Sequence, residues 1–148
     1  MSEQHPMMIR RAAVDACAKK FVDRPVKWGE RDCVKLVALA LRKQGFGIIE
    51  PLKGVRYRTK TSGMKRFKES GFPNLVDAVD KLGLTRIAPA MTLPGDLIAM
   101  QAPDDDPFGA SLMVVHTGAT RRLIGLDGEG MFRVVIPDMK FVLAAWRV

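Results

Sequence analysis

The chain is poor in several features on which large classes of proteins depend. Its 148 residues include two cysteines and two histidines, too few for the disulfide framework of a small secreted domain. No apolar run approaches the roughly 20 residues that a membrane helix requires, and the N-terminus lacks the apolar core of a signal peptide. We therefore expect a protein made in the cytoplasm without membrane insertion, which would leave the cell by another route, such as packaging into a particle.

What the chain does contain is typical of a folded protein. Hydrophobic residues make up 47% of it and charged residues 27%, and its length suits one domain, residues 1–148, with a real core. The net charge of +8 favours polyanionic partners such as nucleic acid, an anionic cell-wall polymer or an acidic protein surface. A solvated basic surface explains the same charge, so both interpretations stay open.

The acidic loop Asp104-Asp105-Asp106 is the one stretch that suggests a metal. A calcium loop needs carboxylates at alternate positions, a central glycine and a distal glutamate. The three adjacent aspartates have none of these features, so we interpret them as a solvated turn. We expect no metal and no cofactor.

Hydrophobic periodicity separates the chain into a helical first part and a stranded second part. Helical spacing and capping residues predict helices over 8–21, 33–44, 63–70 and 75–82. Short apolar runs between turn residues predict strands over 84–87, 95–100, 111–117, 121–126, 131–136 and 143–148. Helices followed by an antiparallel meander indicate the α+β class, with N-terminal helices packed on a sheet of about five to six strands.

One stretch presents a cysteine at the start of a buried helix. Trp28-Gly29 forms a tight turn, Asp32 is suited to cap the helix, and Cys33 is its first residue. A thiol there lies at the positive end of the helix dipole, which lowers its pKa and favours the nucleophilic thiolate. Cys17, in contrast, lies on the apolar stripe of the first helix, formed by Ile9, Ala12, Ala13, Ala16 and Phe21, and we interpret it as a core residue.

The segment from Trp28-Gly29 to Asp32-Cys33 resembles the cysteine segment of the NlpC-type papain-like cysteine peptidases, which are bacterial and phage cell-wall endopeptidases. Pro94-Gly95-Asp96-Leu97-Ile98 is similar to the Gly-Asp-Leu strand of that family, whereas Val34-Lys35 stands where the family has Ser-Gly. The resemblance implies a papain-like fold, a phage-tail-associated context and a substrate site beside Trp28 and Asp32. It also implies peptidoglycan peptides or other tail proteins as partners.

A cysteine hydrolase needs a base near its thiol and a polar group that orients the base. His5 lies in the N-terminal segment, which leaves His116, and His116-Thr117-Gly118 matches the family's His-x-Gly letters. In this hypothesis Cys33 attacks a carbonyl of a wall peptide, His116 transfers the proton, and the Cys33 N–H helps to hold the oxyanion. Asp127 and Ser111 are the candidate third members.

The position of His116 within its strand favours a different hypothesis. Alignment by the preceding apolar run places Leu112, not His116, at the family's histidine position. At roughly 3.3 Å per residue His116 then lies about 13 Å further along the strand, although on the same face. We therefore favour a phage-tail structural or assembly protein whose catalytic site is degenerate. An active peptidase or amidase is the alternative.

The basic segment 53–68 supports a third hypothesis. Its lysines and arginines are interleaved with Tyr57 and Phe67, a pattern that suits contact with a phosphate backbone and stacking on bases. No recognised nucleic-acid motif accompanies it. A solvated helix face is the competing interpretation.

Overall fold

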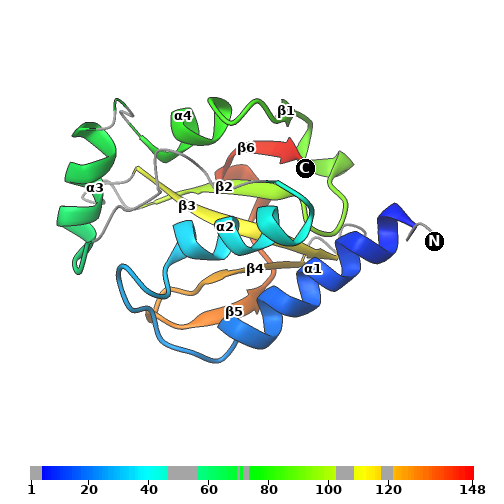
Figure 1. Cartoon of the computed structure of the whole chain (residues 1–148), viewed down its shortest axis with the longest axis horizontal. Coiled ribbons are helices and arrows are strands. Elements are labelled where there is room, and N and C mark those ends of the chain that lie inside the picture. The colour runs from blue at the N-terminus through cyan, green and yellow to red at the C-terminus, as the bar shows by residue number, and fades with distance from the viewer. Residues whose placement is uncertain (1–4, 47–56, 70, 72–73, 103–108, 118–121) are drawn as a thin grey trace.

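A computed structural model describes residues 5–46, 57–69, 71, 74–102, 109–117 and 122–148. Its helices are α1 (Pro6–Phe21), α2 (Cys33–Lys43), α3 (Lys60–Glu69) and α4 (Leu75–Asp80), and two short 3₁₀ turns span Pro89–Met91 and Met139–Phe141. Its strands are β1 (Thr85–Arg86), β2 (Leu97–Gln101), β3 (Ala110–Thr117), β4 (Arg122–Leu126), β5 (Phe132–Val135) and β6 (Val142–Arg147). All six strands join one antiparallel sheet, which confirms the α+β class (Figure 1).

The order of strands in the sheet is β1-β6-β2-β3-β4-β5. Strands β2 to β5 form the expected meander, but β6 returns across the sheet and pairs with both β1 and β2. This corrects the expectation of a simple sequential meander. The reason is visible in β6 itself, where Ala144, Ala145 and Trp146 are all buried. Ala144 and Trp146 face the helix-covered core and Ala145 faces the smaller cluster on the other side of the sheet, while β1 and β2 pair with the two edges of the strand.

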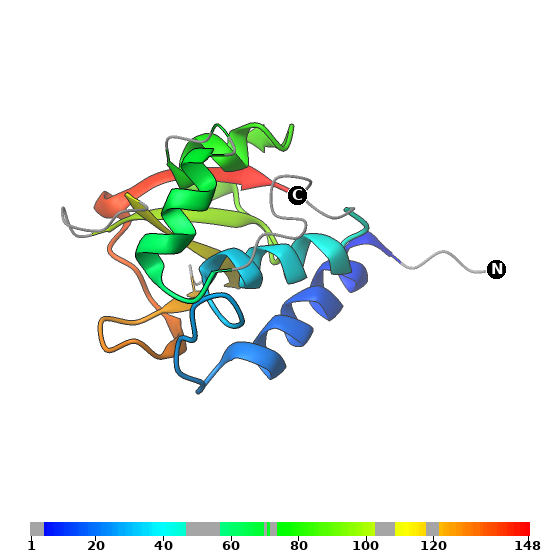
Figure 2. The same ribbon diagram turned by 60° about the vertical axis from the view of Figure 1, so that its left-hand side comes forward.

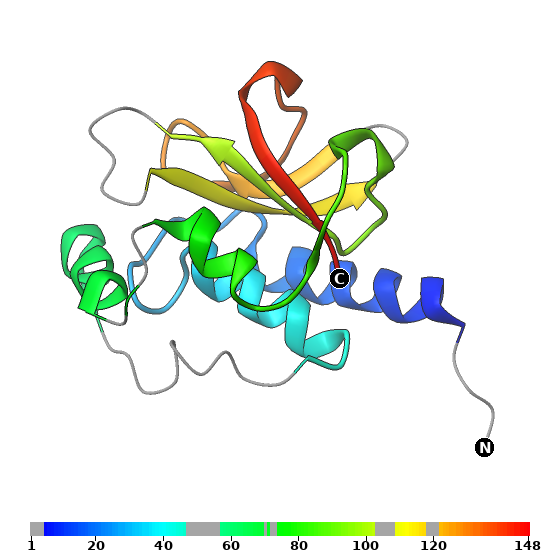
Figure 3. The same ribbon diagram turned by 90° about the horizontal axis from the view of Figure 1, so that it is seen from above.

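The helices lie on one face of the sheet, and Figure 3 shows them below the strands. Helices α1 and α2 pack against each other, and α2 packs against β3. The sheet residues buried on this face are Leu97, Ala99, Ala110, Leu112, Val114, Ile124, Phe132, Ala144 and Trp146. A smaller cluster occupies the other face and comprises Ile98, Met100, Met113, Val115, Leu123 and Ala145. The alternation along β2 and β3 follows the two-residue period of a strand.

Helix α1 begins two residues before the expected position, because Pro6 suits the first turn and the His5 side chain accepts a hydrogen bond from the Met7 N–H. Its buried residues are Ala13, Val14, Cys17 and Phe21. The expected stripe was therefore wrong at Ala12, which is exposed. The prediction of Cys17 as a core residue is confirmed, and burial raises the pKa of its thiol to about 12.

Helix α3 begins three residues earlier than expected, at Lys60. The Thr59 hydroxyl accepts the Ser62 N–H at 3.0 Å and starts the helix one turn sooner than expected. The Asn74 side chain caps α4 and accepts from the Asp77 N–H at 2.9 Å. The aspartates at 104–106 and residues 53–56 of the basic segment lie outside the described residues. Among the described helices, none has the length and apolarity to cross a membrane.

Candidate functional site

The start of α2 is organised around the carboxylate of Asp32, which is fully buried. As predicted, Asp32 caps the helix and accepts from the Lys35 N–H at 2.9 Å. It also accepts from the Gly29 N–H at 2.9 Å, which closes the turn before the helix. A third hydrogen bond comes from the Tyr57 hydroxyl at 2.7 Å. The carboxylate thus ties three parts of the chain together, and Cys33 is the next residue.

The turn also brings two backbones into direct contact. Gly29 has φ +86°, and a Cβ at this position would lie 1.8 Å from the carbonyl oxygen of Tyr57. A residue with a side chain would therefore meet both the strain of left-handed backbone and a clash with main-chain atoms. This close approach packs the segment at Tyr57 onto the turn. Cys33, which follows the turn, is also buried, with 3% of its surface exposed.

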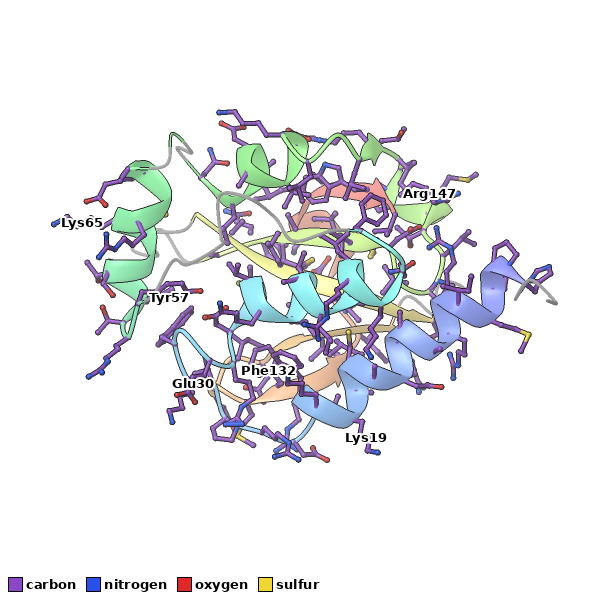
Figure 4. The ribbon with its side chains drawn as sticks, viewed as in Figure 1. Lys19, Glu30, Tyr57, Lys65, Phe132 and Arg147 are labelled. Atoms are coloured by element: carbon purple, nitrogen blue, oxygen red, sulfur yellow. The ribbon has the colours of Figure 1, made fainter. Side chains whose placement is uncertain are left out.

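Tyr57 is the residue of this site that sequence reasoning missed, since we had considered it only as part of the basic segment 53–68, either for base stacking or on a solvated face. The structure buries it and directs its hydroxyl to Asp32, and Figure 4 shows it extending from the start of α3 toward the first turn of α2. Burial raises the pKa of Tyr57 most, and the negative charge of Asp32 and the hydrogen bond to it add to the effect. The one sequence feature that could have drawn attention to Tyr57 is that the chain contains a single tyrosine.

Trp28 forms the outer part of the site. The Nζ atom of Lys60, the first residue of α3, lies 5.5 Å from the centre of the Trp28 ring, within the range of a cation–π interaction. Figures 1 and 2 both place the start of α3 beside the loop that joins α1 to α2. The structure thus links Tyr57 to Asp32, the residue before Cys33, and Lys60 to Trp28.

His116 is at the other end of α2. Gln44 follows the last helical residue and donates from its side chain to the Gly95 carbonyl at 2.9 Å. The Gly95 N–H in turn donates to the carbonyl of Val115, the neighbour of His116, at 2.9 Å. Because α2 has 11 residues, its ends are separated by about 16 Å at 1.5 Å per residue. Figure 1 shows α2 and β3 running in the same direction, so Cys33 lies toward the start of β3.

The charged groups that act on His116 belong to α1 and β4. Burial lowers the pKa of His116 most, the positive charge of Arg11 lowers it further, the carboxylate of Asp15 acts in the opposite direction, and Arg122 lowers it again. Its Nδ1 atom is buried and has no hydrogen-bond partner among the described residues. The other histidine, His5, caps the start of α1. Figure 1 places that end of α1 far from the start of α2.

The two candidate third members have other surroundings. Asp127 accepts from the Glu129 N–H at 2.8 Å and from the Met131 N–H at 3.0 Å. These backbone hydrogen bonds lower the pKa of the Asp127 carboxyl and hold the turn between β4 and β5. Ser111 alternates along β3 with the residues of the helix-covered face, so it belongs to the face of Met113 and Val115. Neither residue is brought to His116 as an orienting group.

Asp96, in the Gly-Asp-Leu segment, has a structural role. It is fully buried and accepts from the Leu93 N–H at 2.8 Å, which closes the turn before β2. Arg10 donates to it at 2.8 Å and Arg147 at 2.9 Å. The N–H of Val148 is a further donor, at 2.9 Å. The carboxylate thus joins α1, the start of β2 and the end of β6.

The described residues contain no group of three or more histidine, cysteine, aspartate or glutamate side chains that could hold a metal ion.

In comparison with known proteins, residues 7–148 match a family described as a domain of unknown function, DUF6950. No curated protein and no solved structure matches the chain. The chemistry of the site therefore has to be argued from its own geometry.

Proposed function

The chain belongs to the DUF6950 family, and we propose that it is a papain-like, NlpC-type domain with a structural or assembly role in a phage tail. In this proposal the turn at Trp28 and Cys33 is a contact surface, and the cysteine does not turn over substrate. The phage-tail context rests on the resemblance of the cysteine segment and the Gly-Asp-Leu segment.

The arrangement of the fold supports the proposal. An Asp-capped cysteine starts a buried helix, and that helix packs on an antiparallel sheet. The segment Gly95-Asp96 leads directly into β2, which pairs with β3 along its whole length. These are the relationships that the resemblance implies for the cysteine helix, the Gly-Asp-Leu strand and the histidine strand.

The observation that carries the proposal is the separation of Cys33 from both histidines. A general base must come within about 3–4 Å of the thiol to take its proton. Cys33 lies at the first residue of α2, whereas His116 lies level with the last turn of the same helix. The helix-facing residues of β3 before His116 are Ala110, Leu112 and Val114, which are buried and apolar. None of these three side chains can accept a proton.

The groups around Cys33 suit binding better than proton transfer. Asp32 is engaged by three donors. The raised pKa of Tyr57 keeps its hydroxyl protonated, so it donates a hydrogen bond and does not act as a base. Lys60 and Trp28 present a cation and an aromatic ring at the outer side of the turn. A cation and an aromatic ring are typical anchors of a protein–protein or protein–peptide contact.

The proposal is tested by incubating purified peptidoglycan and its soluble peptide fragments with the protein and with its Cys33→Ala variant. We expect no cleavage by the wild type beyond that of the variant, and we expect both proteins to cosediment equally with the insoluble wall or with tail proteins. Cleavage that depends on Cys33 would replace the proposal by the active peptidase alternative. If neither protein binds the wall or tail proteins although both are correctly folded, the proposed binding role is wrong.

A further inference from the structure

A groove of about 500 Å³ runs along α3, outside the turn that carries Cys33. The described residues that line it are Thr61, Met64, Lys65, Lys68 and Glu69. Their spacing of three, four, seven and eight residues from Thr61 places them on one face of the helix. The volume falls in the range of pockets that hold small ligands or short peptide segments.

The lining combines two cations with an apolar floor. The side chains of Lys65 and Lys68 are exposed, and no ion pair engages either of them among the described residues. Figure 4 shows Lys65 directed outward from α3. Met64 is 2% exposed and lies between the helix and the core. Glu69, the one carboxylate in the lining, is 3.6 Å from Arg66.

This composition favours a peptide over a nucleic acid. A phosphodiester strand gains much of its sequence-tolerant affinity from bases that stack on aromatic rings. Tyr57 is buried and bonded to Asp32, and Lys60 covers a face of Trp28. A peptide with spaced carboxylates can pair with Lys65 and Lys68 and place an aliphatic side chain over Met64.

The length of the groove agrees with this ligand. From Thr61 to Glu69 the helix rises about 12 Å, which corresponds to roughly three to four residues of extended peptide. We infer that the α3 groove binds an acidic segment of a partner protein, with its carboxylates on Lys65 and Lys68. This inference extends the binding role proposed above, but it does not depend on any property of the thiol.

The test measures the fluorescence anisotropy of a labelled hexapeptide of alternating glutamate and leucine, in low and in physiological salt. We expect saturable binding that weakens with salt and falls about tenfold or more in Lys65→Glu/Lys68→Glu. The matched control, Lys19→Glu/Lys20→Glu, makes the same charge change at two exposed residues of α1 and should lose less than about twofold. Lys65→Gln/Lys68→Gln should lose affinity to an intermediate extent and guards against misfolding of the charge reversal.

Three results would overturn the inference: no binding by the wild type, an equal loss in the α1 control, or tighter binding of an oligothymidylate of the same charge. The first two results would indicate that Lys65 and Lys68 form only a solvated surface. The third would indicate that the groove prefers nucleic acid to an acidic peptide. Binding of the hexapeptide is measured separately from wall cleavage and wall cosedimentation. The groove can therefore fail while the proposed role of the Cys33 turn stands, and the reverse also holds.

Discussion

The hydroxyl of Tyr57 donates a 2.7 Å hydrogen bond to the carboxylate of Asp32, 25 residues earlier in the chain. Asp32 also caps the helix that begins with Cys33. One hydrogen bond therefore fixes the segment before α3 to the start of α2. The position of the thiol depends on this link, because the same carboxylate holds the turn at Gly29.

Replacement of Tyr57 by phenylalanine should destabilise the protein by about 1–3 kcal/mol, because a buried carboxylate loses one donor and no water can replace it without a shift in packing. Urea denaturation of wild type and Tyr57→Phe measures the change. Phe141→Leu, which alters a 43% exposed side chain, is the control and should cost less than about 0.5 kcal/mol. Equal stability of Tyr57→Phe and wild type would show that the hydrogen bond contributes nothing net.

Gly29→Ala should cost more than about 2 kcal/mol, since it adds a clash with the Tyr57 carbonyl to the strain of left-handed backbone. Gly45→Ala is a matched control, because Gly45 has φ +93° and nothing within 4 Å of the added Cβ. The control isolates the backbone strain, about 1–2 kcal/mol. Denaturant midpoints compare the two variants, and equal costs would mean that the contact with Tyr57 relaxes freely.

The two thiols should differ in reactivity. Cys17 is fully buried and its pKa is raised to about 12, so almost none of it is thiolate at neutral pH. We expect a small alkylating reagent to modify Cys33 at least about tenfold faster, as measured by peptide mass mapping over time. A Cys17→Ser variant should keep the fast phase. Equal rates, or faster labelling of Cys17, would remove the main argument for a functional cysteine.

His116 should make stability depend on pH below neutrality. Its folded pKa is lowered, by burial first, whereas the unfolded chain has a pKa of about 6.5. Below that value the unfolded state binds the proton more readily, so the stability present at pH 7 and above decreases as the pH falls toward the folded pKa. Denaturation at pH 7.5 and 5.5 should show a smaller loss for His116→Gln than for wild type. An identical loss of stability in both proteins would show that groups other than His116 cause the pH dependence.

The start of α2 was predictable from sequence because short-range interactions determine it. Asp32 as a cap, Gly29 in the turn and Cys33 as the first helical residue depend on neighbours within a few positions, and all three hold in the structure. The position of His116 near the end of its strand was also predictable, because the apolar run before it forms the body of that strand.

Long-range relationships were not predictable in this way. Nothing near Tyr57 in the sequence indicates that its hydroxyl reaches Asp32, since the contact depends on how the intervening chain returns to the turn. The insertion of β6 between β1 and β2 is also set by packing, because apolar strands of similar length differ little in sequence. Sequence periodicity identified the strand but gave no information on its neighbours.

The separation of Cys33 from His116 is the central claim, and the pH dependence of Cys33 alkylation tests it most directly. The rates are compared between Cys17→Ser and Cys17→Ser/His116→Ala from pH 5 to pH 10. A thiol whose base is absent should give the same curve in both proteins, with rates within about twofold at every pH. A slower reaction near neutral pH in the His116→Ala protein, with the curve displaced to higher pH, would show that the imidazole acts on the thiol and would contradict the account.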